Sequence, residues 1–289
     1  MLNKFNTPSS IVIIYNQDLK AATELALKIK SYLSKDFEVY CESALDIINK
    51  QNLSLEADLI ISVGGDGTIL RCAHIASNDQ VPILGINMGK VGFLCEIEAT
   101  GDVTDKLTKY LNGSAIIESR SKLKINLQND NSKKEYSALN DFVIARGAKI
   151  RLIDIEASIN NKHFATYRGD GVVVSTATGS TAYSFGLGGA IMHPSSNYMT
   201  VKPIASHASL NGGLFLEKGS MLTLKANTEE DFSVSVDGFQ DIQLKEIDRI
   251  EIEIDPESSA KFVRSESFKD DYWGHLAKKL DLRKGESLS

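Results

Sequence analysis

Asp66 lies in a glycine-rich segment whose residue types suit phosphate chemistry. The segment Gly64-Gly65-Asp66-Gly67-Thr68 follows an apolar run and precedes residues with helical periodicity. The N–H groups and the dipole at the start of a helix favour anions, and a carboxylate there can accept a hydroxyl proton or help to organise magnesium near phosphates. A plain turn aspartate is the alternative interpretation. The flanking strand and helix favour the functional one, with Asp66 as the candidate catalytic residue.

A run of hydroxyl-bearing residues forms a second candidate site. Five of the seven residues from Ser175 to Thr181 carry a hydroxyl group, after an apolar strand and before a short helix. Hydroxyl groups and the amides of a helix start suit ribose, amide and phosphate groups. A helix cap would use only one hydroxyl, so the density of the cluster favours ligand binding. Gly186, Gly188 and Gly189 follow, which indicates either close approach of a ligand or a plain loop.

Two common nucleotide-binding patterns do not fit this sequence. The Rossmann fingerprint needs a glycine at position 70, where Leu70 stands, and Asp66 would place a negative charge beside a pyrophosphate. A P-loop around Gly89-Lys90 would need a glycine at position 84 and a hydroxyl at position 91, but these positions hold Leu84 and Val91. The nucleotide must therefore be bound in another way.

Four further segments are weaker candidates, each with a structural alternative. Asn140-Asp141 lies inside a strand-like segment, where a ligand contact and a bond from the side chain to a turn are about equally expected. Arg168-Gly169-Asp170-Gly171 is either a tight hairpin turn or an arginine and a carboxylate directed at a polar ligand. Arg71, one helical turn beyond Thr68, is a candidate phosphate contact, and Asp237-Gly238 is most simply a hairpin turn.

The elements that must position these residues alternate between strands and helices in the first part of the chain. The predicted strands are 11–15, 37–41, 58–63 and 81–87, and the predicted helices are 21–33 and 68–76. This alternation is typical of an open, mostly parallel α/β sheet. We assign it to a first domain, residues 1–115, whose ligands should gather at the carboxyl ends of the strands.

The next part of the chain predicts an all-β domain, residues 116–262. After Gly113, strand-like segments separated by Asn, Asp, Lys and Gly turns replace the helical periodicity. Because isolated hairpins are marginally stable, these strands should pack into a sandwich or a similar structure. The predicted strands are 121–127, 136–145, 150–159, 171–175, 220–225, 232–236 and 247–254. A short helix should follow Thr178, and residues 263–289 should form a terminal helix that packs back on the first domain.

Composition narrows the class of protein. The 289 residues carry a net charge of -6, which argues against nonspecific binding of nucleic acid. The three cysteines and five histidines show no zinc-like spacing, so we expect reduced, buried thiols and no structural metal. No apolar run approaches the roughly 20 residues that span a bilayer, and the first residues lack a signal core. We therefore expect a cytoplasmic protein that binds no membrane.

The two glycine- and hydroxyl-rich motifs, in this order and across this change of domain, resemble the NAD kinase family. The resemblance covers residues from about 58 to 237. It implies an α/β domain followed by a β domain, NAD bound in the cleft between them, and a homotetramer or homodimer. It also implies ATP as phosphoryl donor, with Mg²⁺ or another divalent metal as cofactor, and no direct metal ligand from the protein can be assigned.

The resemblance implies roles for individual residues. Asp66 would be the proton acceptor and would also contact the dinucleotide. The other residues at its nucleotide-contact positions are Gly67, Arg71, Phe93, Asn140, Asp141, Arg151, Arg168, Asp170, Thr178, Gly179, Ser180, Thr181, Ala182 and Tyr183. Three positions depart from the family pattern. Asp141 stands where glutamate is usual, Ala177 stands where proline is common, and an extra residue precedes Gln240, which leaves the role of Gln240 open.

The function that follows is transfer of the γ-phosphoryl group of ATP to the 2'-hydroxyl of the adenosine ribose of NAD, giving NADP and ADP. A lipid kinase would share the glycine-rich loop but present an apolar acceptor pocket or a membrane-facing surface. A noncatalytic sensor of NAD or NADP would bind the dinucleotide without turnover and would not need Asp66.

Overall fold

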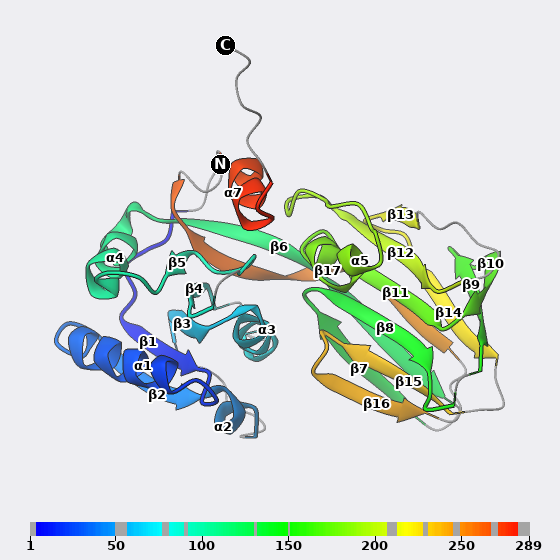
Figure 1. The fold of residues 1–289 in the computed structure, drawn as a ribbon, viewed down its shortest axis with the longest axis horizontal. Coiled ribbons are helices and arrows are strands. Elements are labelled where there is room, and N and C mark those ends of the chain that lie inside the picture. Colours follow the sequence, from blue (N-terminus) through cyan, green and yellow to red (C-terminus); the bar gives the residue numbers. More distant parts are fainter. Residues whose placement is uncertain are drawn as a thin grey trace, which may run out of the picture. The chain divides into compact units, whose positions relative to one another are not determined.

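The computed structural model describes residues 4–49, 57–76, 81–89, 92–129, 132–149, 151–206, 213–227, 231–244, 249–266 and 271–282. The chain forms two compact units (Figure 1). Unit 1 combines Met1–Ser119 with Ala260–Ser289, and unit 2 is Arg120–Ser259. Among the described residues, none of the helices combines the length and the apolar character needed to cross a membrane.

Unit 1 is built on a parallel sheet. Its strands are β1 (Ser10–Tyr15), β2 (Glu38–Ser43), β3 (Leu59–Gly64), β4 (Ile83–Asn87) and β5 (Ile97–Glu98), and the end of β17 (Arg249–Arg264) adds to β4 through Phe262 and Ile83. Neighbouring strands run in the order β2-β1-β3-β4, and each of these pairs is parallel. All residues of β3 and β4 are buried, as expected for parallel strands covered on both faces.

Helices accompany the sheet in unit 1. They are α1 (Lys20–Leu33), α2 (Ala44–Asn49), α3 (Asp66–Ile75), α4 (Val103–Lys109) and, near the end of the chain, α7 (Tyr272–Lys279). In α1 the buried residues Ala22, Ala26, Ile29 and Leu33 recur at helical spacing. They pack in one cluster with the apolar residues of β1, β3 and β4, so a single amphipathic face fixes this helix to the sheet.

Unit 2 consists of antiparallel strands. They are β7 (Ser132–Ala138), β8 (Asp141–Arg146), β9 (Ile153–Ile159), β10 (Lys162–Gly169), β11 (Gly171–Thr176), β12 (Tyr198–Ile204), β13 (Leu214–Glu217), β14 (Leu222–Asn227), β15 (Phe232–Val236) and β16 (Gln240–Leu244). One sheet has the order β13-β12-β11-β8-β15-β16, and β10, β9 and β14 belong to another. Buried residues of both sheets form one core. The strand β6 (Ile116–Asn129), like β17, contributes residues to both units.

The predicted fold class is confirmed, since a parallel α/β region, an antiparallel β region and a C-terminal helix are all present. The exact domain limits 1–115, 116–262 and 263–289 stay predictions. One predicted strand was wrong in detail, because residues 136–145 form two strands with a break at Leu139 and Asn140. The short helix after Thr178 is a 3-10 turn, Gly179–Thr181, followed by α5 (Tyr183–Gly186).

Candidate active site

Asp66 follows the carboxyl end of β3 and opens α3. A side chain at Gly64 would place its Cβ 2.2 Å from Thr68 Oγ1, so this glycine allows β3 and α3 to meet closely. A Cβ at Gly65 or Gly67 would meet nothing within 4 Å. The start of α3 has no side-chain cap. The glycine-rich segment therefore presents Asp66 at an open helix start, as phosphate binding requires.

The Asp66 carboxylate is fixed by the main chain of a second loop. The N–H of Phe93 donates to one carboxylate oxygen at 2.8 Å, and the N–H of Leu94 donates to the other at 3.0 Å. Gly92 lies so close that an added Cβ would be 3.2 Å from Asp66 Oδ1. Each oxygen keeps a second lone pair. Asp66 can therefore anchor this loop and still accept a proton.

Asn87, which the sequence analysis did not select, shapes the other end of this loop. It is the last residue of β4, and only 2% of it is exposed. Its amide donates to Gly89 O at 3.1 Å and to Glu98 Oε2 at 3.0 Å, while its Oδ1 accepts from the N–H of Gly89 at 3.1 Å. An asparagine that ends an apolar run two residues before a glycine was the signal available in the sequence.

Arg264 holds the same loop from its carbonyl side. Its buried guanidinium donates to Leu94 O at 2.9 Å and pairs with Glu118 at 2.9 Å and Glu96 at 3.3 Å. The ring of Phe262 lies 5.0 Å from the guanidinium carbon. Leu94 is thus bound to Asp66 through its N–H and to Arg264 through its carbonyl oxygen, which fixes the loop on both sides.

A second predicted group gathers in unit 2 around Asp237. The carboxylate of Asp237 accepts three consecutive main-chain N–H groups, from Leu139 at 2.8 Å, Asn140 at 2.7 Å and Asp141 at 3.1 Å. Such convergence is incompatible with a continuous strand, in which successive N–H groups point to opposite sides. This explains the break between β7 and β8. Asp237 and Gly238 also form the turn from β15 to β16, with φ of 52° and 69°.

Asp141 is a buried carboxyl group whose pKa is raised. Burial, reinforced by the negative charge of Asp237, raises the pKa of Asp141 to about 7, and a bond from the N–H of Tyr183 opposes this shift. Burial also raises the pKa of Asp237, although its three main-chain bonds counteract the change. The ammonium of Lys122 belongs to the same buried region, where burial lowers its pKa and Asp255 and Asp237 raise it.

The hydroxyl run has a larger internal role than its sequence indicated. Thr176 Oγ1 donates to Leu139 O at 2.6 Å, Ser180 Oγ donates to Ala177 O at 2.6 Å, and Thr181 Oγ1 donates to Thr178 O at 3.2 Å. Ser180 Oγ also accepts from the N–H of Met192 at 2.9 Å. These hydroxyls stabilise the turn itself.

Thr178 and Gly179 differ from the rest of this run. The hydroxyl of Thr178 is buried and has no hydrogen-bond partner within the part of the chain that the structure describes. A Cβ at Gly179 would lie 2.1 Å from the carbonyl oxygen of Asn140. The predicted residues Asn140, Asp141, Gly179 and Tyr183 are therefore brought together, and Thr178 offers an unused hydroxyl to a ligand.

Asp170 and Arg168 are engaged with neighbours rather than with each other. Asp170 Oδ1 accepts from Arg146 Nε at 2.7 Å, and Arg168, whose side chain is 69% exposed, lies 3.8 Å from Asp154. The hairpin interpretation of this segment was wrong. β10 and β11 belong to different sheets, and the link between them is a crossing from one sheet to the other. Arg151 is exposed after β8.

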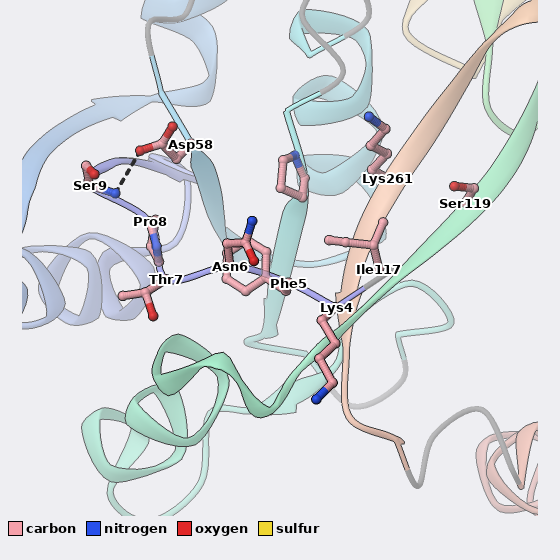
Figure 2. Close-up of a pocket in the computed structure, with 11 residues that line it drawn as sticks. Lys4, Phe5, Asn6, Thr7, Pro8, Ser9, Asp58, Ile117, Ser119 and Lys261 are labelled. Carbon is pink, nitrogen blue, oxygen red and sulfur yellow. Dashed lines mark hydrogen bonds between the residues drawn. The ribbon is translucent and has the colours of Figure 1, made fainter. Parts of the chain in front are cut away.

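A cavity of about 390 Å³ opens elsewhere on unit 1, at the amino ends of β1, β3 and β4 (Figure 2). Its carboxylate, Asp58, accepts from the N–H groups of Ser9 at 2.7 Å and Ser10 at 3.0 Å and so fixes the start of β1. The lysines at its rim, Lys4 and Lys261, point in different directions. Asp58 precedes β3, whereas Asp66 follows it, roughly 20 Å further along the strand. The cavity is therefore separate from the Asp66 site.

Comparison with known proteins decides the family. Residues 45–115 match the family model of the ATP-NAD kinase N-terminal domain, and residues 139–265 match that of the ATP-NAD kinase C-terminal domain. An NAD kinase of Dehalococcoides mccartyi is 38% identical over 245 residues, which are 84% of this chain and 86% of the relative. The chain belongs to the NAD kinase family. It is therefore an enzyme, and the lipid-kinase interpretation no longer applies.

Further members of the family agree in sequence and in fold. An NAD kinase of Natranaerobius thermophilus is 35% identical over 84% of this chain and 88% of its own length. Yeast NADH kinase, solved in complex with NADH, gives a TM-score of 0.81 at 22% identity and covers 99% of this chain and 91% of its own. An NAD kinase from Archaeoglobus fulgidus, solved in complex with ATP, gives 0.73 at 24% identity over 92% and 98%. At these identities the two structures support the fold.

Proposed function

We propose that this member of the NAD kinase family transfers the γ-phosphoryl group of ATP to the 2'-hydroxyl of the adenosine ribose of NAD. The observation that carries the proposal is the Asp66 carboxylate, which stands at the uncapped start of α3 and is fixed by two main-chain N–H groups. A fixed carboxylate beside an anion-binding helix start is the arrangement that a phosphoryl transfer to an alcohol needs.

In the proposed reaction, Asp66 orients the hydroxyl group and accepts its proton late. The ribose oxygen forms a bond to the γ-phosphorus, the bond from that phosphorus to the β,γ-bridging oxygen breaks, and ADP leaves with the electron pair. In a loose transition state the nucleophile does not have to be deprotonated early, so positioning contributes most of the rate. The free lone pairs of the fixed carboxylate supply both the hydrogen bond and the proton acceptor.

The proposed metal is magnesium that arrives bound to ATP. Within the described residues, no group of three or more His, Cys, Asp or Glu side chains could hold a metal ion. Magnesium in such sites is typically held by one or two carboxylates together with substrate phosphates and water, and Asp66 is the carboxylate placed to contribute. Bound magnesium would neutralise negative charge on the phosphates.

The dinucleotide is proposed to contact residues of the predicted list. In unit 2, the buried and mutually close groups around Asn140, Asp141 and Gly179 support this assignment, as does the unused hydroxyl of Thr178. Gly67, Arg71 and Phe93 are proposed contacts in unit 1. Arg151, Arg168, Asp170, Ser180, Thr181, Ala182 and Tyr183 complete the proposed set. We also propose that the enzyme is cytoplasmic and forms a homodimer or homotetramer.

Replacement of Asp66 by asparagine tests the mechanism. We expect kcat for NADP formation from NAD, ATP and magnesium to fall at least roughly 100-fold, since this is typical of removing a positioned base. NADP is measured through a dehydrogenase that reduces only NADP.

The control for Asp66→Asn is substrate binding, because asparagine can accept only one of the two loop N–H groups. Calorimetric affinities for NAD and for a nonhydrolysable ATP analogue should fall far less than kcat does, because both ligands keep their other proposed contacts. Near-normal turnover by the folded variant would refute the role of Asp66. Wild-type protein that binds NAD without forming NADP would instead support the sensor alternative.

A further inference from the structure

Lys279 lies on α7, near the end of the chain, and approaches the loop that holds Asp66. Its Nζ is 5.9 Å from the centre of the Phe93 ring, a distance compatible with a cation–π contact. The N–H of the same Phe93 donates to the Asp66 carboxylate at 2.8 Å. A residue more than 200 positions beyond the glycine-rich segment therefore brings a positive charge to the same place.

The ammonium of Lys279 is only partly exposed and lacks a close anionic partner. Burial and the positive charge of Arg264 lower its pKa, and the negative charges of Asp66 and Glu98 oppose this shift. Within the described parts of the chain, however, Lys279 forms no ion pair and no hydrogen bond. Glu98 is instead bound to the amide of Asn87 at 3.0 Å, and both oxygens of Asp66 already accept main-chain N–H groups.

An unpaired, partly buried ammonium is unfavourable for folding. A lysine on this helix can instead keep its ammonium in water, as the neighbouring residue Lys278 does. An anion that binds beside Asp66 would complete the missing interaction through a charge-assisted hydrogen bond. In a protein with a net charge of -6, such a local cation is also what a polyanionic nucleotide needs.

We propose that Lys279 is a phosphate-binding residue that contacts the terminal phosphoryl group of the donor triphosphate. This inference rests on the proposed function of the Asp66 site and adds the C-terminal helix to it. It assigns to α7 a role in binding the donor, in addition to its packing within unit 1.

The test compares Lys279→Met with Lys278→Met and Lys279→Arg. We expect Lys279→Met to weaken binding of a nonhydrolysable ATP analogue and to raise KM for ATP by roughly tenfold or more, the usual effect of losing a hydrogen bond to a charged group. Binding of AMP, which lacks the terminal phosphates, and KM for NAD should stay within about twofold of wild type, and Lys279→Arg should recover most of the affinity. Lys278→Met, the exposed control, should behave as wild type.

Thermal unfolding separates this role from a structural one. Because Lys279→Met removes an uncompensated charge, its Tm should equal or exceed that of the wild type. Unchanged affinity for the ATP analogue, or a lower Tm with equal losses for the analogue, AMP and NAD, would overturn the proposal. If wild-type protein forms no NADP, the proposed function fails, while the binding comparison of the analogue and AMP still decides the role of Lys279.

Discussion

Asp141 and Asp237 show how burial and main-chain bonds act in opposite directions on the acidity of single residues. Both side chains are buried, but three N–H groups stabilise the charge of Asp237, whereas one N–H group reaches Asp141. Burial raises the pKa of both carboxyl groups, that of Asp141 to about 7, and the negative charge of Asp237 adds to the shift of Asp141. A carboxyl group that titrates near neutral pH makes the stability of unit 2 depend on pH.

The direction of this dependence follows from the folded-state pKa of Asp141, which lies above the ordinary value of about 3.9. The stabilising contribution is fully present below about pH 4 and is lost as the pH rises toward 7. Asp141→Asn cannot titrate. We therefore expect the Tm of this variant, relative to that of wild type, to increase by several degrees between about pH 5 and about pH 8.

The matched control for Asp141→Asn is Asp36→Asn, since Asp36 is exposed in unit 1. Its Tm difference from wild type should be small at both pH values. A pH-independent difference for Asp141→Asn, measured by calorimetry in the same buffers, would contradict the assigned titration.

At the scale of elements, the loop before β8 and the turn after β11 pack directly against each other. Thr176 and Gly179 both contact the main chain of residues 139 and 140, and the strand break there is fixed by Asp237. The contact leaves no room for a side chain at position 179. The geometry of the proposed dinucleotide contacts therefore depends on a glycine for steric reasons, independent of any ligand.

Gly179→Ala tests this contact. An added Cβ would lie 2.1 Å from Asn140 O, so the two segments must separate, which should cost about 1–3 kcal/mol of unfolding free energy. KM for NAD should rise with it. Gly186→Ala is the control, because a Cβ there meets nothing within 4 Å, and its denaturant midpoint should stay near that of wild type. Equal midpoints for both variants would show that the turn can move without cost.

At the scale of the whole molecule, Arg264 ties together segments from both ends of unit 1. Its partners Leu94, Glu96 and Glu118 all precede unit 2 in the sequence, and Arg264 follows it. The Arg264 side chain is 1% exposed, as is expected of a charge that is both paired and hydrogen-bonded. Removal of the guanidinium would take from Glu96 and Glu118 the positive charge with which both form ion pairs.

Arg264→Met should lower the unfolding free energy by about 3–5 kcal/mol, because it breaks a buried ion-pair network on one side only. Arg249→Met is the control on the same strand. Arg249 pairs with Glu251 at 2.7 Å but is 42% exposed, so its loss should cost about 1 kcal/mol or less. Denaturant unfolding measures both. A similar cost for the two variants would show that the Arg264 network is not a major source of stability.

The sequence predicted the parallel strands β1 to β4, the helices α1 and α3 and the position of Asp66 after a strand, because apolar periodicity is a local signal. It gave no expectation for α4, β10, β12, β13 or β16. It did not predict what holds the site together. Asp66 binds amides 27 and 28 residues away, and Asp237 binds amides 96 to 98 residues away. Such bonds to the main chain require no particular side chain at the partner position. Asn87 and Arg264 were missed as well, because no local pattern reveals their partners Glu98, Leu94, Glu96 and Glu118.

The order in which the ribosome releases these segments follows from the division of the chain. All of Arg120–Ser259 leaves the exit tunnel before Ala260, so unit 2 is complete while unit 1 still lacks its last strand and helix. Glu96 and Glu118 emerge 168 and 146 residues ahead of Arg264. During synthesis these two carboxylates remain without their arginine until unit 2 has been made, and the loop beside Asp66 obtains the support of Arg264 only after that.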